Sequence, residues 1–307
     1  MSDHVFIIGE IGSNFDCDLE NANNYVTSLS ACGVDAVKFQ TLRKDKLVAP
    51  RIWQDKMWVE NPVNQKFSNL ELPDEWHFEL KQTADEHDIE FISTPFYLEA
   101  VNLLEEVGVT TYKIASGDIT FTPLLETVGR TGKRVILSTG ASSLSDIERA
   151  LETLTRVGSG PVSLLHCVAN YPPKWSEMNL RALVTLKETF DLPIGISDHS
   201  PGDIIPLAAV ALGATIIEKH VTFDRSLPGP DHPFAMTMDE FCEMVTRVRL
   251  LEQALGTGEK DPTESEAAKQ HRIRRGVYDR STFEPSKADE GIWLRPEHRD
   301  FNNSRTH

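Results

Sequence analysis

The sequence predicts a (β/α)8 TIM barrel, and two observations carry this prediction. Short β-branched segments alternate with longer segments of helical periodicity along most of the 307 residues, which is typical of parallel strands joined by crossover helices. Eight such repeats occupy roughly 250 residues, the usual size of a closed barrel. We therefore expect a barrel over residues 1–256 and a short C-terminal arm over residues 257–307.

The expected strands are rich in β-branched and aromatic residues. They are residues 5–12, 35–40, 90–96, 111–116, 134–140, 162–168, 193–199 and 215–223. Amphipathic helices are expected between them, several followed by the glycine that favours a helix end. They include residues 18–32, 74–87, 98–107, 145–157, 180–190 and 238–255. An open doubly wound sheet is the alternative, but no GxGxxG motif follows any of these strands.

Two segments do not fit the repeat. Residues 42–72 make a long excursion after the second expected strand and are rich in Trp, Asn, Lys and Glu. Insertions of this kind are usually functional loops or dimer contacts. Residues 257–307 are charged and poor in apolar periodicity, so we expect a tail or arm there and not a second domain.

Composition excludes several classes of protein. The formal net charge of −16, from 47 acidic and 31 basic residues, disfavours nucleic acid and anionic membrane surfaces as partners. No apolar run approaches the roughly 18 residues that a membrane span requires, and no apolar leader precedes Val5. Because Cys17, Cys32, Cys167 and Cys242 show no CxxC spacing, we expect four reduced thiols in a cytoplasmic protein.

Polar residues end almost every expected strand, which is where the active site of a barrel forms. These residues are Glu10, Lys38, Gln40, Ser93, Thr94, Lys113, Ser116, Asp118, Ser138, Thr139, His166, Asn170, Tyr171, Ser197, Asp198, His199, Glu218, Lys219 and His220. A single one is most simply a capping or hydrogen-bonded residue, but so many together favour an active site. Because the rim is circular, Glu10 is expected beside Glu218 and His220.

Two histidines indicate a metal. His199 and His220 end consecutive expected strands, which places two imidazoles side by side in a geometry suited to a divalent metal. The alternative is two unrelated rim histidines. Two histidines, with water and a substrate oxygen as the other ligands, would suit Mn²⁺ best, and Mg²⁺, Co²⁺, Zn²⁺ and Fe²⁺ are other candidates. A site left open in this way implies that the metal acts as a Lewis acid on a carbonyl group.

A patch of cations and hydroxyl groups on the same rim is suited to a phosphate and a carboxylate. It comprises Lys38, Lys113, Ser93, Thr94, Ser116, Ser138 and Ser197. Taken alone, Lys113 could instead be the Schiff-base lysine of an aldolase. The loop PGPDHPF from Pro228 is expected to cover the end of the last strand, and its Asp231 could reach a sugar hydroxyl.

These residues lie in motifs that resemble a known family. The strings IGEIGSN, DAVKFQT, FISTPF, YKIASGD, ILSTGAS, LLHCVANYP, GISDHS and IEKHVTFDRSLPGPDH occur in this order between Val5 and Leu255. They resemble the sialic acid synthase family, which includes N-acetylneuraminate, legionaminate and pseudaminate synthases. The resemblance implies condensation of phosphoenolpyruvate with an open-chain N-acetylated aldose, which yields a 3-deoxy-2-ulosonic acid and phosphate. It also implies a homodimer.

The resemblance assigns roles to individual residues. It makes His199 and His220 the Mn²⁺ ligands and Glu10, Glu218 and Lys113 the catalytic residues. The phosphoenolpyruvate contacts would be Lys38, Thr94, Lys113, Ser116, Ser138 and Ser197, and the sugar contacts would be Glu10, Gln40, Asn170, Tyr171 and Asp231.

Three features depart from the family pattern. One is the Asn that the family usually places two residues before the Tyr of the sixth strand, because here Ala169 and then Asn170 precede Tyr171. The family usually has N-H-N-G where this chain has Asn14-Phe15-Asp16-Cys17, which puts sugar contacts of the first loop in doubt. The family also adds a C-terminal antifreeze-like domain that lends an arginine to the partner subunit. Here the stretch from Arg272 resembles only the linker and a vestige of that domain. We therefore expect an acceptor other than N-acetylmannosamine, and Arg272, Arg274, Arg275 or Arg295 of a partner could supply the lost cation.

Two other functions stay open at this point. A related synthase of octulosonate or heptulosonate phosphates would need a second phosphate site, and the rim offers no obvious extra cluster of Arg and Lys. A barrel that binds sugar or phosphoenolpyruvate without turnover belongs to a different class. Intact Glu10, Lys38, Lys113 and Glu218, together with both histidines, favour an enzyme instead.

Overall fold

A computed structural model describes residues 4–61, 64, 67, 70–282, 284, 285 and 292–294. The chain divides into two compact units, Met1–Leu255 and Gly256–His307.

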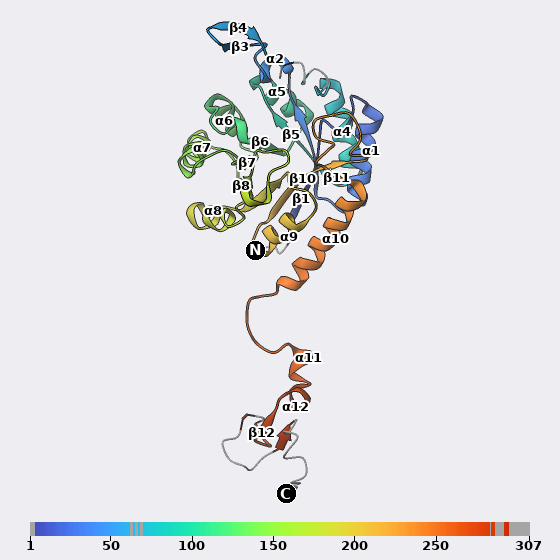
Figure 1. Ribbon diagram of the computed structural model, residues 1–307, viewed down its shortest axis with the longest axis vertical. Coiled ribbons are helices and arrows are strands. Elements are labelled where there is room, and N and C mark those ends of the chain that lie inside the picture. The colour runs from blue at the N-terminus through green and yellow to red at the C-terminus, as the bar shows by residue number, and fades with distance from the viewer. Residues whose placement is uncertain are drawn as a thin grey trace. The chain divides into compact units, whose positions relative to one another are not determined.

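The first unit is a closed barrel of eight parallel strands, so the predicted (β/α)8 TIM barrel is confirmed (Figure 1). The strands are β1 (Phe6–Gly12), β2 (Ala36–Thr41), β5 (Glu90–Pro95), β6 (Thr111–Ile114), β7 (Arg134–Ser138), β8 (Val162–Cys167), β9 (Ile194–Asp198) and β10 (Ile216–Thr222). Pairing between β1 and β10 closes the ring. A two-residue strand, β11 (Met236–Thr237), pairs with the end of β10.

Helices surround the ring, as Figure 1 shows. They are α1 (Leu19–Ala31), α4 (Asp74–Glu86), α5 (Leu98–Val107), α6 (Thr122–Gly129), α7 (Leu144–Val157), α8 (Ala182–Phe190), α9 (Ile204–Ala211) and α10 (Met238–Leu255). The short α2 (Lys44–Leu47), η1 (Ser116–Asp118) and η2 (Trp175–Glu177) lie in connections. All six helices named from the sequence are confirmed, with ends displaced by no more than about the two residues usual for such boundaries. Asp18, for example, caps α1 by accepting a hydrogen bond from Asn21 N.

The strand pattern positions the rim. A separate buried cluster takes one residue from each of six strands, namely Ile8, Ala36, Ile92, Ile136, Leu165 and Ile216. Successive side chains alternate across a strand, so residues two positions further along face the same side. Those residues are Glu10, Lys38, Thr94, Ser138, Cys167 and Glu218. The apolar layer of the barrel interior is therefore followed directly by a polar layer at the carboxyl ends of the strands.

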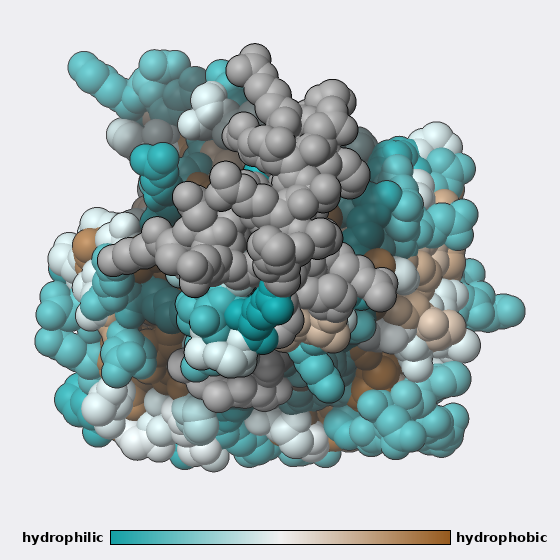
Figure 2. Space-filling model, turned by 90° about the horizontal axis from the view of Figure 1, so that it is seen from below, coloured by the Kyte–Doolittle hydropathy of each residue, from teal (hydrophilic) through white to brown (hydrophobic). Residues whose placement is uncertain are grey.

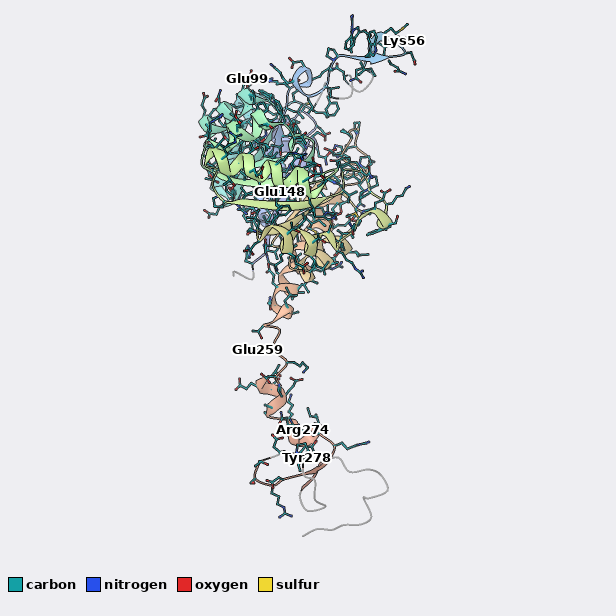
Figure 3. All side chains as sticks on the ribbon, turned by 90° about the vertical axis from the view of Figure 1, so that its left-hand side faces the viewer. Lys56, Glu99, Glu148, Glu259, Arg274 and Tyr278 are labelled. Carbon is teal, nitrogen blue, oxygen red and sulfur yellow. A yellow bond between two sulfur atoms is a disulfide. The ribbon has the colours of Figure 1, made fainter. Side chains whose placement is uncertain are left out.

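The insertion after β2 contains a hairpin that the sequence did not predict. Strands β3 (Arg51–Gln54) and β4 (Met57–Glu60) are antiparallel, and Asp55 and Lys56 form the turn with positive φ angles, as a tight hairpin requires. Lys56 marks the tip in Figure 3. Trp53 and Trp58 contact each other edge to face at 5.5 Å between ring centroids, although both side chains are exposed.

The second unit contains small elements of its own. These are α11 (Glu264–Ala267), α12 (Gln270–Ile273) and the antiparallel strands β12 (Gly276–Tyr278) and β13 (Ile292–Leu294). Arg274 lies over the ring of Tyr278 at 5.8 Å from its centroid, and Figure 3 labels both residues. The interpretation of this unit as a vestige of a larger domain stays a prediction. Arg295, one of the arginines expected to supply a cation to a partner, lies outside the described residues.

The expectation of four reduced thiols is wrong for one pair. Cys32, just after α1, and Cys242 on α10 form a disulfide with Cα atoms 4.7 Å apart. They are 210 residues apart in sequence, but α1 and α10 follow the two strands that close the barrel, which brings the cysteines together. Cys167 is a buried thiol.

The surface is that of a protein rich in charged residues. Hydrophilic side chains cover much of the coloured face in Figure 2, and apolar side chains form small areas between them. Among the described residues, no helix combines the length and apolar character needed to cross a membrane.

A buried ion pair ties β9 to β10 on the helix-facing side. Lys219 Nζ lies 2.5 Å from Asp198 Oδ2 and donates a hydrogen bond to Ser200 O at 2.6 Å. Ser200 donates from its N and Oγ to the same carboxylate, at 2.9 and 3.0 Å. Burial lowers the pKa of Lys219, and the charge of Asp198 partly offsets this effect.

Asp198→Ala should therefore lower the free energy of unfolding by about 3–5 kcal/mol, because it leaves a buried ammonium without its partner. Urea denaturation followed by circular dichroism measures this loss. Asp85→Ala is the matched control, since Asp85 pairs with Lys81 on the exposed face of α4 and surface ion pairs contribute little. Equal effects of the two substitutions would contradict the prediction.

Candidate active site

Barrel closure places the first strand beside the last at the carboxyl rim. Glu10 is the register partner of His220 on β10 and of Lys38 on β2. Glu218 pairs in register with Ser197 on β9. Glu10 therefore lies beside His220 through strand pairing, and Lys38, which contacts both carboxylates, shows that Glu218 is close to Glu10 as expected.

Two lysines and two glutamates form a buried cluster on this rim. Lys38 Nζ lies 2.7 Å from Glu10 Oε2 and 3.9 Å from Glu218 Oε2, and Lys113 Nζ lies 3.8 Å from that same Glu218 oxygen. All four side chains are almost fully buried. Charges in such a place are stable only because they compensate one another.

The cluster shifts the pKa values of its members. Burial opposes the charge of Lys38, but Glu10 and Glu218 outweigh it, so the pKa of Lys38 is raised. Burial lowers the pKa of Lys113, with Glu218 acting in the opposite direction. Burial also opposes the charge of Glu218, but Lys113 and Lys38 hold its pKa below the usual range. An anion that bound beside Lys113 would favour the charged ammonium further.

Hydroxyl groups surround the two ammonium groups. Lys38 donates to Thr94 Oγ1 at 3.4 Å and Lys113 donates to Ser138 Oγ at 2.6 Å. Ser197 donates to Glu218 Oε1 at 2.8 Å, and Ser116 Oγ accepts from Gly140 N at 2.9 Å. Ser93 was also assigned to the patch, but its hydroxyl group bonds to Thr41 Oγ1 at 2.7 Å, on the side that faces His77 of α4. Apart from Ser93, the predicted cations and hydroxyl groups are gathered on one part of the rim, where they can bind carboxylate and phosphate oxygens.

The two rim histidines face each other, with ring centroids 5.4 Å apart. His199 Nδ1 contacts the carbonyl oxygen of Val168 at 3.3 Å. Burial, and then the neighbouring His220, lower the pKa of His199 to about 3. His220 Nδ1 is buried and forms no hydrogen bond with the described residues; Asp231 Oδ2 lies 3.9 Å away.

This arrangement fits a divalent metal. Neutral imidazoles are the metal-binding form of histidine, and a backbone carbonyl at one ring nitrogen leaves the other to bind metal. The described residues hold no group of three or more His, Cys, Asp and Glu side chains able to enclose an ion. Any metal here would therefore take its other ligands from water or substrate, as open catalytic sites do.

Aromatic rings cover the histidine pair. Tyr171 contacts His199 at 4.3 Å between centroids, and Phe234 contacts His220 at 5.0 Å and His199 at 6.0 Å. Phe234 is a site residue that sequence reasoning missed. Its only signal was its place in the Pro228–Phe234 loop, which was expected to cover the last strand end.

Three of the five residues assigned to the sugar, Glu10, Gln40 and Asp231, lie together around Gly12, whereas Tyr171 lies on His199. Gln40 Nε2 donates to Glu10 Oε1 at 2.8 Å, and Ser13 Oγ donates to Asp231 Oδ2 at 3.1 Å. Gly12 has a φ of +57°, and a Cβ there would lie 3.0 Å from Asp231 Oδ2, so glycine is favoured at this position. Asn170 instead donates to Glu177 at 3.2 Å and is exposed.

Asp118 is a rim residue to which the sequence assigns no role. Burial raises the pKa of its carboxyl group to about 6, and the charge of Lys113 acts in the opposite direction. Its position two residues after Ser116, which is assigned to phosphoenolpyruvate, was the feature of the sequence that could have indicated a role in the site. A carboxyl group with this pKa can exchange a proton near neutral pH.

The altered first loop is packed into the fold. Asn14 is fully buried and donates to Val221 O at 2.8 Å. Phe15 is buried against Phe39 and Trp76, each 6.3 Å away between ring centroids. Asn14 matches the first residue of the usual motif, whereas Phe15 stands where the family has His and has packing contacts of its own.

Known proteins with this architecture are similar along most of the chain. An uncharacterised protein of Methanocaldococcus jannaschii is 43% identical over 262 residues, which cover 85% of this chain and 75% of that protein. The N,N'-diacetyllegionaminic acid synthase of Campylobacter jejuni is 38% identical over 280 residues, which cover 89% of this chain and 84% of the synthase.

A solved structure extends this similarity to three dimensions. The N-acetylneuraminic acid synthetase of Leptospira borgpetersenii has a TM-score of 0.79 and 37% identity, over 87% of this chain and 90% of that one. The model of the NeuB family matches residues 25–260. The resemblance deduced from the motifs is therefore confirmed, and this chain belongs to the NeuB family.

Proposed function

We propose that this protein joins phosphoenolpyruvate to the aldehyde carbon of an open-chain aldose of the N-acetylhexosamine type. The products would be a 3-deoxy-2-ulosonic acid and phosphate. The observation that supports this most is the buried cluster of Lys38, Glu10, Glu218 and Lys113 beside the His199–His220 pair. Relatives named as legionaminic and pseudaminic acid synthases point in the same direction.

Lys38, Lys113 and the surrounding hydroxyl groups would hold the carboxylate and phosphate of phosphoenolpyruvate. Carbon 3 then bonds to the aldehyde carbon, whose oxygen takes up a proton and becomes a hydroxyl group. Positive charge develops at carbon 2, where Glu10 and Glu218 can stabilise it. Water adds to carbon 2 and loses a proton, and cleavage of the bond to the phosphate oxygen releases phosphate and forms the new keto group.

We also propose a divalent metal, Mn²⁺ first, held by His199 and His220. The metal would polarise the aldehyde carbonyl. A charge argument supports it, because the two lysines and two glutamates cancel and do not by themselves compensate a multiply charged anion. The Nδ1 of His220, which has no hydrogen-bond partner among the described residues, is a second argument from this chain's own side chains.

The acceptor is proposed to differ from N-acetylmannosamine. The loop of residues 14–17 lacks the His and the Gly of the usual family motif, and Phe15, which stands in place of the His, is used for packing. Gln40 and Asp231 are the side chains that we assign to the sugar hydroxyl groups, together with Glu10. Tyr171 and Phe234 would contact its apolar faces.

The first test measures phosphate release from phosphoenolpyruvate with Mn²⁺ and a panel of aldoses. Release should require an aldose, and His220→Ala should lower kcat/KM roughly 100-fold or more because the metal is lost. Mn²⁺ affinity of the same variant, followed by electron paramagnetic resonance of the unbound ion, gives a readout without turnover. His87→Ala, at the end of α4, is the control. Best activity with N-acetylmannosamine would overturn the proposed acceptor.

Lys113→Met should raise the KM for phosphoenolpyruvate roughly 10- to 100-fold, since a charge-assisted hydrogen bond to the anion is lost. The KM for the aldose should change much less. Lys133→Met is the matched control, because Lys133 precedes β7 and pairs with Glu105 at the opposite end of the barrel. Steady-state kinetics at varied concentrations of both substrates separate the two constants; an unchanged KM for phosphoenolpyruvate would refute the assignment.

We further propose a cytoplasmic homodimer in which the second unit supplies a cation to the partner's sugar site. Truncation after Leu255 should then raise the KM for the aldose and leave the KM for phosphoenolpyruvate close to that of the full chain. Light scattering coupled to size-exclusion chromatography gives the oligomeric state of both forms. Full activity of the truncated protein would rule this proposal out.

A further inference from the structure

The connection from β10 to β11 carries two residues of the candidate site. We call residues 223–235 the rim loop. Asp231 lies against Gly12 and Ser13, and Phe234 lies on the two metal-site histidines. The position of this loop therefore determines what a sugar would meet.

His232 lies between these two residues and is buried in the rim loop. Its side chain is fully buried, with Nδ1 2.7 Å from Thr222 Oγ1 and Nε2 3.0 Å from Asp16 Oδ1. The loop folds closely around the ring, because a Cβ on Gly229 would lie 2.7 Å from His232 Cδ2. His232 is thus the centre of the loop's packing and not part of the site surface.

Asp16 lies in the loop after β1, 216 residues earlier in the chain than His232. It has a φ of +54°, and its second oxygen lies 3.5 Å from Asn21 Nδ2 on α1. A carboxylate that accepts from a buried imidazole forms a strong hydrogen bond, and its removal would leave the buried donor unsatisfied. The contact joins the loop after β1 to the loop after β10.

We infer that Asp16 and His232 are a positioning pair that holds the rim loop over the acceptor side of the site. This inference rests on the proposed function. The pair keeps Asp231 beside Glu10 and Gln40, and Phe234 on the histidines. The residues assigned to phosphoenolpyruvate come from β2, β5, β6, β7, β9 and η1, so the pair should govern the affinity for the aldose and not that for phosphoenolpyruvate.

Kinetics of three variants test this role. Asp16→Ala should raise the KM for the aldose roughly tenfold, the effect of losing one strong hydrogen bond, with little change in the KM for phosphoenolpyruvate. Asp16→Asn keeps an acceptor oxygen for His232 and should restore most of the affinity. Asn21→Ala is the matched control, since it removes the other partner of Asp16 and leaves the contact with His232 in place.

Limited trypsin digestion of the native full-length protein gives a readout that needs no turnover. Arg225 lies in the rim loop and is held by Ala235 O at 2.9 Å and by Glu240, so the bond between Arg225 and Ser226 reports on loop opening. Trypsin should cut this bond faster in Asp16→Ala than in wild type or in the Asp16→Asn and Asn21→Ala variants. Mass spectrometry of the fragments identifies the bond that is cut.

The outcomes distinguish failure of the positioning role of Asp16 and His232 from failure of the proposed synthase activity. Equal cleavage and equal KM values for Asp16→Ala and Asn21→Ala would overturn the positioning role. A rise in both KM values together with a lower melting temperature would also overturn it, because that pattern marks general destabilisation. If wild type releases no phosphate with any aldose, the proposed function fails, and the cleavage rates alone decide on the pair.

Discussion

The ion-paired cluster of Lys38, Glu10, Glu218 and Lys113 depends on the closure of the barrel between β1 and β10. Glu10 and Glu218 come from these two strands, and Lys38 lies close enough to contact both carboxylates. Separating buried charges from their partners is costly, so the cluster constrains the register of the closing strands. The neighbouring positions follow from the same register, since Glu10 is the partner of His220. The contacts that form the buried charge cluster of the candidate site are therefore the same contacts that join β1 to β10.

The two halves of the site are built in different ways. The cations and most of the hydroxyl groups stand on strands, one step beyond the apolar layer of Ile8, Ala36 and Ile136, where packing holds them rigidly. Asp231 and Phe234 stand on a loop, whose contacts with β1 and the histidines come from side chains. Loops accept sequence change more readily than strands. A difference in acceptor between members of this fold is therefore expected in the loop half.

Most of the fold and the polar rim could be predicted because both follow from local periodicity. Alternation along each strand is enough to identify Glu10, Lys38, Ser138 and Glu218 as inward-facing rim residues. Helix α9 is not predicted, because IIPLAAVA is apolar on every side. The disulfide of Cys32 and Cys242 and the contact of Phe234 with the histidines depend on residues distant in sequence, which carry no local signal. Asn170 was assigned to the sugar because it lies near the end of a strand, but this position does not determine the direction of its side chain.

The departure at residues 14–17 changes how the first loop supports the site. Asn14 bonds to the backbone of Val221, and Asp16 bonds to His232 beyond the end of β10. Both contacts run from the loop after β1 to the segment that follows His220. A side chain of the first loop that pointed toward the sugar could not at the same time bond to the rim loop. Under the proposed function, the first loop would contribute to the acceptor side through the position of Asp231, and acceptor selectivity would depend on how the loop after β1 and the rim loop pack together.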